Sequence, residues 1–295
     1  MTDIAIFERQ RSHLLGIAYR MLGEMAAAED VVQEAWLRWR RAGGEDIRDP
    51  KAWLSAVTVR LSLDALRSAR ARRETYVGPW LPEPLLPDDT RALAADAPAA
   101  KAELASDLSL ALLHVLERLT PEERAALILH DAFDSDYADI AAVLNKTEAA
   151  CRKLVSRARE RVKADRPRHT VSGEQHRALL TRFMAAAATH DASVITPLLA
   201  NDVVLYSDGG GKVAAALNPI FGADKVARFT AGVIRKFWST GNLAGEIAEV
   251  NGTPGLLLRE AGTIHSVITV DIDGDAISAI YFVRNPDKLE RLAHA

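Results

Sequence analysis

The chain has 295 residues, of which 48% are hydrophobic and 26% are charged, and its formal net charge is −3. This balance is typical of a water-soluble globular protein of about two to three domains, and it excludes a disordered chain. The longest stretch without Asp, Glu, Lys or Arg has eleven residues, Val213 to Ala223, whereas a membrane helix needs roughly 20 mainly apolar residues. The charged N-terminus lacks the pattern of a secretory leader. We therefore expect a cytoplasmic protein that does not span a membrane.

The distribution of charged residues and the cysteine count limit the possible classes of protein further. Between Arg60 and Arg73 five arginines stand against one acidic residue, and between Lys146 and Arg168 nine basic residues stand against three acidic ones. Two basic segments in a nearly neutral chain indicate a polyanionic partner such as nucleic acid, although solvated helix faces would look the same. The single cysteine, Cys151, excludes an intrachain disulfide and a cysteine-rich zinc site, so we expect it to pack in the interior.

The first predicted elements are helices, between residues 3 and 73. The segment from Glu29 to Arg41 has apolar residues at the spacing of one buried helix face: Val32, Ala35, Trp36 and Trp39. Its polar residues fall largely on the other faces, where they could meet a partner protein. These residues are Asp30, Gln33, Glu34 and Arg38.

A proline-rich segment ends this helical part. Four prolines stand at positions 79, 82, 84 and 87, so a regular helix cannot continue through them. Helical periodicity resumes near Lys101 and lasts to about Asp165, and from Glu174 one predicted helix is followed by β-rich runs and glycine turns. The predicted organisation is therefore a helical domain (1–73), a linker (74–100), a second helical domain (101–168) and an α+β domain (174–295).

The second helical domain has the pattern of a helix-turn-helix. Thr120-Pro121-Glu122-Glu123 forms a capping box that begins a helix. A short helix from Tyr137 to Leu144, a turn at Asn145 and a basic helix from Glu148 to Lys163 follow. Leu154, Ala158 and Val162 are expected to form the packing stripe of that last helix, with Val155 beside it. Five residues are expected to project toward DNA: Arg152, Lys153, Ser156, Arg157 and Arg159.

Separated motifs carry a resemblance to a known family. Ala28 to Arg38, Pro50 to Leu54, Arg60 to Asp64 and Leu116 to Val162 resemble regions 2 and 4 of bacterial extracytoplasmic-function (ECF) RNA polymerase sigma factors. Three further segments resemble signatures of the subgroup that carries a fused C-terminal SnoaL-like domain. They are Tyr76 to Pro84, Asp208 to Lys212 and Asn285 to Leu289. The fold class that this implies is multidomain, with two all-α sigma domains and a cone-shaped α+β SnoaL-like domain.

The resemblance implies a transcription initiation factor, with core RNA polymerase and promoter DNA as partners, without a cofactor or metal, and not an enzyme. Asp30, Gln33, Glu34 and Arg38 would bind the polymerase, and Arg60, Ser62, Asp64 and Arg67 would engage the minus-10 element. Leu61-Ser62 stands where many relatives have Asn after the Arg of this helix, so individual base contacts there are left open. The minus-35 element would be read by Thr147, Arg152, Lys153, Ser156, Arg157 and Arg159.

The linker is long enough for this role. Its 27 residues, 74 to 100, reach at most about 90 Å when extended. The two promoter elements of such systems lie about 60 Å apart, at 3.4 Å for each base pair. One chain can therefore contact both elements.

The α+β domain leaves an enzyme of the ketosteroid isomerase type as one alternative. Its candidate acid and base groups do not form a recognisable constellation in the sequence. The glycine run before Lys212 lacks the upstream Gly and the following Ser/Thr of a phosphate-binding loop, and we expect it to be a flexible hairpin loop. The acid and base candidates are His190, Asp191, Tyr206, Asp208, His265 and Tyr281.

We expect this domain to regulate the sigma domains in cis, because Trp80 and the four prolines are costly to expose unless something covers them. The alternative is that Trp80 packs on the first helical domain. A ligand-sensing helix-turn-helix regulator remains a competing class, a small-molecule ligand in the C-terminal pocket is left open, and we expect a monomer. The regulatory contact would involve Tyr76, Trp80, Pro82, Glu83, Pro84, Asp208, Gly209, Gly210, Gly211, Lys212, Asn285, Pro286, Asp287, Lys288 and Leu289.

Overall fold

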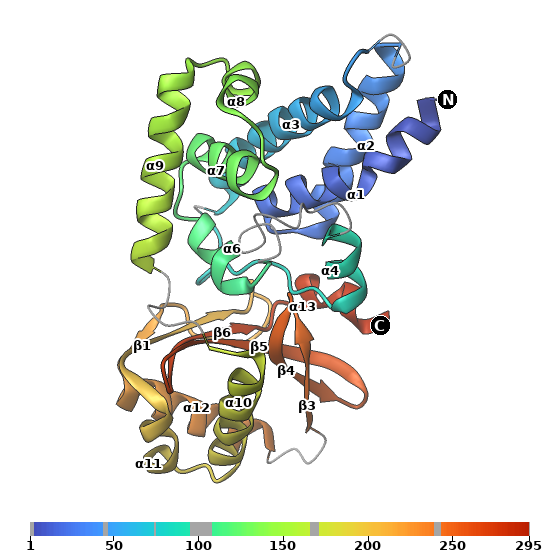
Figure 1. The fold of residues 1–295 in the computed structure, drawn as a ribbon. Helices are drawn as coiled ribbons and strands as arrows, with labels where there is room; N and C mark the ends of the chain where they lie inside the picture. The colour runs from blue at the N-terminus through green and yellow to red at the C-terminus, as the bar shows by residue number, and fades with distance from the viewer. Residues whose placement is uncertain are drawn as a thin grey trace. The chain divides into compact units, whose positions relative to one another are not determined.

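The computed structural model describes residues 3–43, 47–73, 75–94, 108–165, 171–238 and 243–294. The chain divides into two compact units. The N-terminal unit comprises Met1–Thr75, Asp88–Leu108 and Leu112–Asp165, and the C-terminal unit comprises Tyr76–Pro87, Ser109–Ala111 and Arg166–Ala295. The predicted linker, residues 74 to 100, is thus divided between the two units, and Tyr76–Pro87 belongs to the C-terminal one. Figure 1 shows the helices of the first unit in blue to green and the sheet of the second in yellow to red.

The N-terminal unit begins with three long helices, α1 (Asp3–Leu22), α2 (Met25–Arg41) and α3 (Pro50–Arg73), followed by the shorter α4 (Pro87–Ala94). Gly23 lies between α1 and α2 with a φ of 72°, a conformation that glycine adopts without strain. The predicted buried face of α2 is confirmed at Val32, Ala35 and Trp39, which are buried. Trp36 is half-buried against Phe7, with ring centroids 4.9 Å apart.

The second half of this unit contains α6 (Leu110–Leu116), α7 (Pro121–Leu127), the π-helical turn η3 (Ile128–Ala132), α8 (Tyr137–Leu144) and α9 (Glu148–Asp165). The predicted capping box at Thr120 and Glu123 is present. Asn145 ends α8 in the left-handed conformation, with a φ of 53°, so the tight turn of the helix-turn-helix is confirmed. The π-helical turn was not predicted, because one inserted residue leaves no clear sequence signal.

The buried stripe of α9 differs slightly from the prediction. It consists of Cys151, Val155, Ala158 and Val162, whereas Leu154 is only half-buried. The reason is the helical period, which places residue 154 about 70° from the centre of this stripe, at its edge. The interior position expected for Cys151 is confirmed.

One buried arginine joins distant segments of the N-terminal unit. The Arg124 guanidinium donates to Met21 O at 2.6 Å, to Leu116 O at 2.8 Å and to Glu117 Oε1 at 2.7 Å. Burial lowers the pKa of Arg124 to about 9, so the group stays charged at neutral pH. This side chain connects the end of α1 to the start of α7.

The C-terminal unit is a six-stranded sheet with helices. Its strands are β1 (Leu199–Asp208), β2 (Ile220–Phe221), β3 (Leu243–Val250), β4 (Thr253–Glu260), β5 (Thr263–Asp273) and β6 (Ala276–Val283), in the order β2-β1-β6-β5-β4-β3. Only the β1–β6 pair of this sheet is parallel. The helical segments are α10 (Gly173–Ala188), α11 (Ala192–Ile195), η4 (Thr196–Leu198), α12 (Ala223–Trp238), α13 (Pro286–Leu289) and η5 (Glu290–His294).

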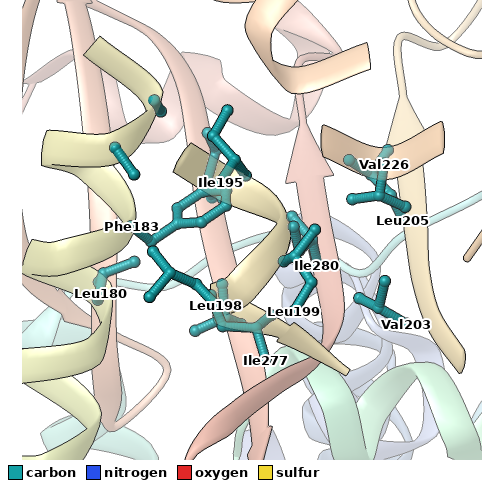
Figure 2. Close-up of a cluster of buried hydrophobic side chains, with 14 of the residues drawn as sticks. Leu180, Phe183, Ile195, Leu198, Leu199, Val203, Leu205, Val226, Ile277 and Ile280 are labelled. Carbon is teal, nitrogen blue, oxygen red and sulfur yellow. The ribbon is translucent and has the colours of Figure 1, made fainter. Parts of the chain in front are cut away.

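Each face of this sheet carries a separate hydrophobic cluster. Side chains of α10, α11 and α12 pack on one face, where Leu180, Phe183 and Ile280 lie together (Figure 2). On the other face, Leu81 of the proline-rich segment and Leu289 of α13 pack with strand residues such as Val267. Residue types alternate along the strands because successive side chains point to opposite faces. The proline-rich segment is thus part of the hydrophobic core of this unit.

Among the described residues, none of the helices is both long enough and apolar enough to cross a membrane.

Candidate functional sites

The outer face of α2 is the first candidate binding surface. Asp30, Gln33 and Arg38 are exposed, and Arg38 Nε lies 3.0 Å from Glu34 Oε1 in an ion pair of moderate exposure. The structure thus brings the four predicted residues to one accessible side of the helix. Leu37 is 39% exposed and was missed, although its spacing of four residues from Gln33 indicated the same face.

On α3 the predicted DNA-contacting residues are not all accessible. Arg60, Asp64 and Arg67 are exposed along one face, and Arg67 Nη1 lies 3.3 Å from Asp64 Oδ1. Ser62 is fully buried, so the assignment of Ser62 to DNA contact is wrong for this packing of α3. Two residues correspond to about 200° of rotation around a helix, so Ser62 points opposite to the face of Arg60 and Asp64.

Arg60 is engaged within the N-terminal unit. Its Nη2 donates to Ala142 O at 2.9 Å and its Nε to Val143 O at 3.2 Å. These carbonyls lie at the end of α8, where free carbonyls and the helix dipole attract a cation. In this structure the guanidinium that was predicted to meet the minus-10 element therefore contacts the helix-turn-helix.

The predicted DNA-binding residues of α9 are exposed: Arg152, Lys153, Ser156, Arg157 and Arg159. Thr147 instead caps the helix, because its Oγ1 accepts from Ala150 N at 3.2 Å. Arg152 Nη2 donates to Glu148 Oε2 at 2.8 Å, and Arg159 Nε donates to Asp131 Oδ2 at 2.9 Å. The helix thus presents a basic surface in which two arginines already have acidic partners.

A buried carboxylate organises the predicted regulatory segments of the C-terminal unit. Asp208, at the end of β1, is fully buried. It accepts from Tyr76 Oη at 2.5 Å, from Leu81 N at 2.8 Å and from Gly210 N at 3.0 Å. Lys288 Nζ completes the site at 2.7 Å from Asp208 Oδ2. We call this group the linker clasp: Tyr76, Trp80 and Leu81 of the linker with Asp208, Asn285 and Lys288.

The clasp holds the linker from both sides. Lys288 is 5% exposed and also donates to Leu81 O, while its Nζ lies 4.0 Å from the centre of the Trp80 ring. Asn285 Nδ2 donates to Tyr76 Oη at 2.9 Å. Of the two alternatives for Trp80, the structure thus supports the contact with the C-terminal domain. The predicted linker, glycine loop and tail are brought together around one ion pair.

The glycines of this loop lie in close contact with neighbouring residues. A Cβ on Gly210 would lie within 2.9 Å of Asn285 atoms, and a Cβ on Gly209 would lie 2.5 Å from Val213 O. Gly210 and Gly211 also have positive φ values of 60° and 72°. The predicted hairpin is confirmed, because the loop connects the antiparallel strands β1 and β2, and the close packing of its glycines was not predicted. Lys212, which follows them, forms an exposed ion pair with Asp287 at 2.6 Å.

Beyond the clasp, the linker continues along the same unit. Leu81, Pro82, Glu83, Pro84 and Leu85 are all buried. Leu85 N donates to Asn251 Oδ1 at 2.8 Å, and Asn251 N donates to Leu85 O at 2.9 Å. The role of Asn251 was missed, and its turn position after β3 gave no signal of a contact 166 residues away. The linker is thus bound as an extended peptide through its own backbone.

The acid and base candidates of this unit do not share a catalytic site. Tyr206 stacks on Tyr281, Asp208 belongs to the clasp, and Asp191 caps α11. His190 is exposed after α10, and burial lowers the pKa of His265, which lies beside Arg284. An apolar cavity of about 70 Å³ between α10, α12 and the sheet is lined by none of the six. Its lining is Phe183, Met184, Ala187, Leu205, Phe229, Thr230, Val233, Ile234, Gly245, Leu256, Leu258, Ile268, Ile280 and Phe282.

A helical unit that contains a helix-turn-helix with a basic second helix, followed by an α+β unit, is the organisation expected of a multidomain promoter-recognition protein. The family model "Sigma-70 region 2" matches residues 6–72, and "Sigma-70, region 4" matches residues 109–162. The chain is 39% identical to the ECF RNA polymerase sigma factor SigJ of Mycobacterium tuberculosis, covering 97% of this chain and 93% of the relative. It is 31% identical to the probable ECF sigma factor SigI of the same species, covering 98% and 95%.

A solved structure agrees with these matches. The crystal structure of Mycobacterium tuberculosis SigJ superposes with a TM-score of 0.75 at 37% identity, covering 97% of this chain and 98% of that one. The chain therefore belongs to the ECF family of RNA polymerase sigma factors. This confirms the predicted fold class in its main parts, in which regions 2 and 4 are followed by a C-terminal α+β domain. It also places the protein among transcription factors.

Proposed function

We propose that the outer face of α2 binds core RNA polymerase, that α3 engages the minus-10 element, and that α9 engages the minus-35 element. The observation that carries this proposal is the exposure of the polar residues of α2, of Arg60, Asp64 and Arg67, and of the basic residues of α9. The buried faces of the same helices form the core of the N-terminal unit. Contact between Arg60 and α8 would have to open before both elements are bridged, since they lie about 60 Å apart. We also propose that the free chain is a cytoplasmic monomer.

Charge reversal on α2 tests the polymerase contact. Glu34→Arg should weaken binding to core polymerase by at least about tenfold and abolish promoter-specific run-off transcripts, because a rim charge is inverted and the Arg38 pair is lost. The matched control is Glu8→Arg on α1, which is also exposed and should leave both measurements unchanged. Equal effects of the two variants would contradict the α2 assignment.

The competing class of a ligand-sensing repressor predicts a different result in the same experiment. Such a protein would dimerise, bind a palindrome and yield no transcripts when added to core polymerase. Sedimentation of the free chain measures the oligomeric state directly. A dimer that binds palindromic DNA and fails to bind polymerase would favour that class.

We propose that the C-terminal domain regulates the sigma regions in cis by holding the linker. Leu81 to Leu85 can contact polymerase or DNA only after they leave the C-terminal unit, because these residues are buried there. The buried ion pair of Asp208 with Lys288 supports a stable bound state that is lost as a whole when one partner is removed. The C-terminal domain would thus inhibit the sigma regions of its own chain, as a separate inhibitory protein would inhibit a sigma factor in a complex of two chains.

We further propose that the apolar cavity takes a small uncharged ligand that is bound and not transformed. Its lining has one hydroxyl, that of Thr230, and none of the lining residues is titratable. A charged ligand would be left without a partner there, which costs several kcal/mol. Gly245 of β3 faces this space without a side chain, and a Cβ there would lie 3.4 Å from Met184 Cε and from a Leu256 methyl group. A glycine inside a strand is typical of a site where another group approaches closely.

Filling the cavity tests this ligand. Gly245→Leu should abolish the rise in melting temperature that a small apolar probe such as xenon produces in the native protein, while keeping the fold. Gly232→Ala is the matched control, because it adds a methyl group on α12 with open space around it. An equal rise in all three proteins would place the probe elsewhere, and no rise in the native protein would contradict a site for small apolar molecules.

A further inference from the structure

The exposed side of α9 is divided into two stripes. Arg152, Ser156, Arg159 and Lys163 follow one another at intervals of four, three and four residues, so they lie in one line along the helix. We call this line the flank. Lys153 and Arg157 lie about 100° further around the helix, opposite the buried stripe of Cys151, Val155, Ala158 and Val162. We call these two residues the crest.

The flank borders a hollow that the crest does not reach. About 250 Å³ of space is lined by Tyr137 of α8 and by Arg152, Ser156, Arg159, Glu160 and Lys163. Three cationic groups and two hydroxyls thus face the hollow, against one carboxylate. Arg152 lies over the Tyr137 ring, with its Cζ 4.9 Å from the ring centre. The hollow thus presents guanidinium, ammonium and hydroxyl donors together, and two of its cations, Arg152 and Arg159, also have carboxylate partners outside its lining.

Arg159 is held in a fixed orientation at this hollow. Its Nε and Nη2 both contact the Asp131 carboxylate, which is largely buried and lies 2.8 Å from His130 Nδ1. The hydrogen bond to Asp131 raises the pKa of Arg159. A guanidinium has five N–H donors, so this bidentate contact leaves the Nη1 donors available for another acceptor. The π-helical turn η3 supplies both Asp131 and His130.

We propose that this hollow binds a phosphate of the DNA backbone beside the minus-35 element, and that Asp131 is the positioning residue for Arg159. A recognition helix directs its crest toward the base edges of the major groove, while its flanks meet the phosphates of the groove walls. Arg152 and Arg159 therefore set affinity, whereas Lys153 and Arg157 set sequence preference. This rests on the proposed function and reassigns Arg152 from base reading to backbone contact.

The flank and the crest are distinguished by two substitutions in the full-length chain. Arg159→Met should weaken binding by about five- to tenfold equally on the promoter and on every minus-35 variant, and should lower the log–log salt slope by about 0.9. Lys153→Met should instead lose roughly 5- to 100-fold of discrimination at one base pair. Fluorescence anisotropy with labelled duplexes over a salt series measures both. A change of sequence preference in Arg159→Met, or an unchanged salt slope, would overturn the hollow as a phosphate site.

Non-specific duplex separates this inference from the proposed function. If the native chain has no preference for any promoter, the proposed function fails, but phosphates are still present on the duplex. Arg159→Met should then still lower the salt slope on random DNA, whereas Arg177→Met, which removes an exposed arginine of α10, should not. Equal salt slopes for these two variants would overturn the hollow as a phosphate site, independently of the proposed function.

Asp131→Asn tests the positioning role by the sign of its effect. Removing a negative charge beside DNA should tighten binding if only net charge matters. Loss of the bidentate contact should instead weaken binding about threefold, because Arg159 becomes free to rotate. In the Arg159→Met background, Asp131→Asn should no longer weaken binding. Tighter binding of the single variant, or the same weakening in both backgrounds, would overturn the positioning role.

Discussion

Replacing Lys288 by methionine should release the linker and raise promoter-specific transcription by about tenfold or more. Lys288 is buried and contacts Asp208, the Leu81 carbonyl and the Trp80 ring. Removing it leaves the Asp208 carboxylate buried without its cation, which typically costs about 3–5 kcal/mol. We expect a cost of this size to release residues 76 to 87 from the C-terminal unit. Run-off transcription with core polymerase measures the consequence, and limited proteolysis at residues 76 to 87 measures the release.

The chain supplies a matched control and a second variant for this experiment. Lys212→Met removes a lysine from the neighbouring loop, whose ion pair with Asp287 is more than half exposed, and should change little because exposed pairs contribute about 0–1 kcal/mol. Tyr76→Phe removes two hydrogen bonds from the linker side alone, so it leaves the sheet intact. It should also raise transcription, by a smaller factor. If Lys288→Met and Tyr76→Phe both become sensitive to protease without any change in transcription, the linker clasp is structural and does not regulate.

Arg124→Met should lower the stability of the N-terminal unit by about 3–5 kcal/mol. Arg124 is fully buried and satisfies two backbone carbonyls and the Glu117 carboxylate. Methionine fills much of the same space, so the loss comes from the polar partners that are left without a donor. For a unit of this size the melting temperature should fall by about 10 °C. Circular dichroism at helical wavelengths reports mainly on this unit.

An exposed arginine provides the comparison. Arg91→Met removes an ion pair with Asp88 in which both side chains are more than 70% exposed, and should change stability by no more than about 0.5 kcal/mol. Because the two units can unfold separately, the helical transition must be followed by itself. A fall of less than about 1 kcal/mol for Arg124→Met would show that the three acceptors find water or other donors.

Much of the helical half was predictable because its signals are local. The capping box at Thr120, the turn at Asn145 and the buried face of α2 each depend on residues within one or two helical turns. Where packing decided the outcome, the family resemblance alone was not enough. It assigned Ser62 to DNA contact, yet Ser62 is buried because α3 turns that position toward the core.

The three segments proposed to regulate were recognised in the sequence as motifs, but the contacts among them were not predicted. The sequence alone determined that a proline-rich segment, a glycine run and a short tail are unusual, because prolines prevent helix and glycines permit tight turns. Only the tertiary structure decided that they meet at Asp208, because that contact joins residues 132 and 80 positions apart in the chain. Likewise, composition indicated a basic α9, while the placement of Asp131 and Tyr137 beside it separates the flank from the crest. Neighbouring residues determine helices, caps and turns, because these depend on contacts within a few positions. Pairs that are far apart in the sequence form only when the whole chain has folded.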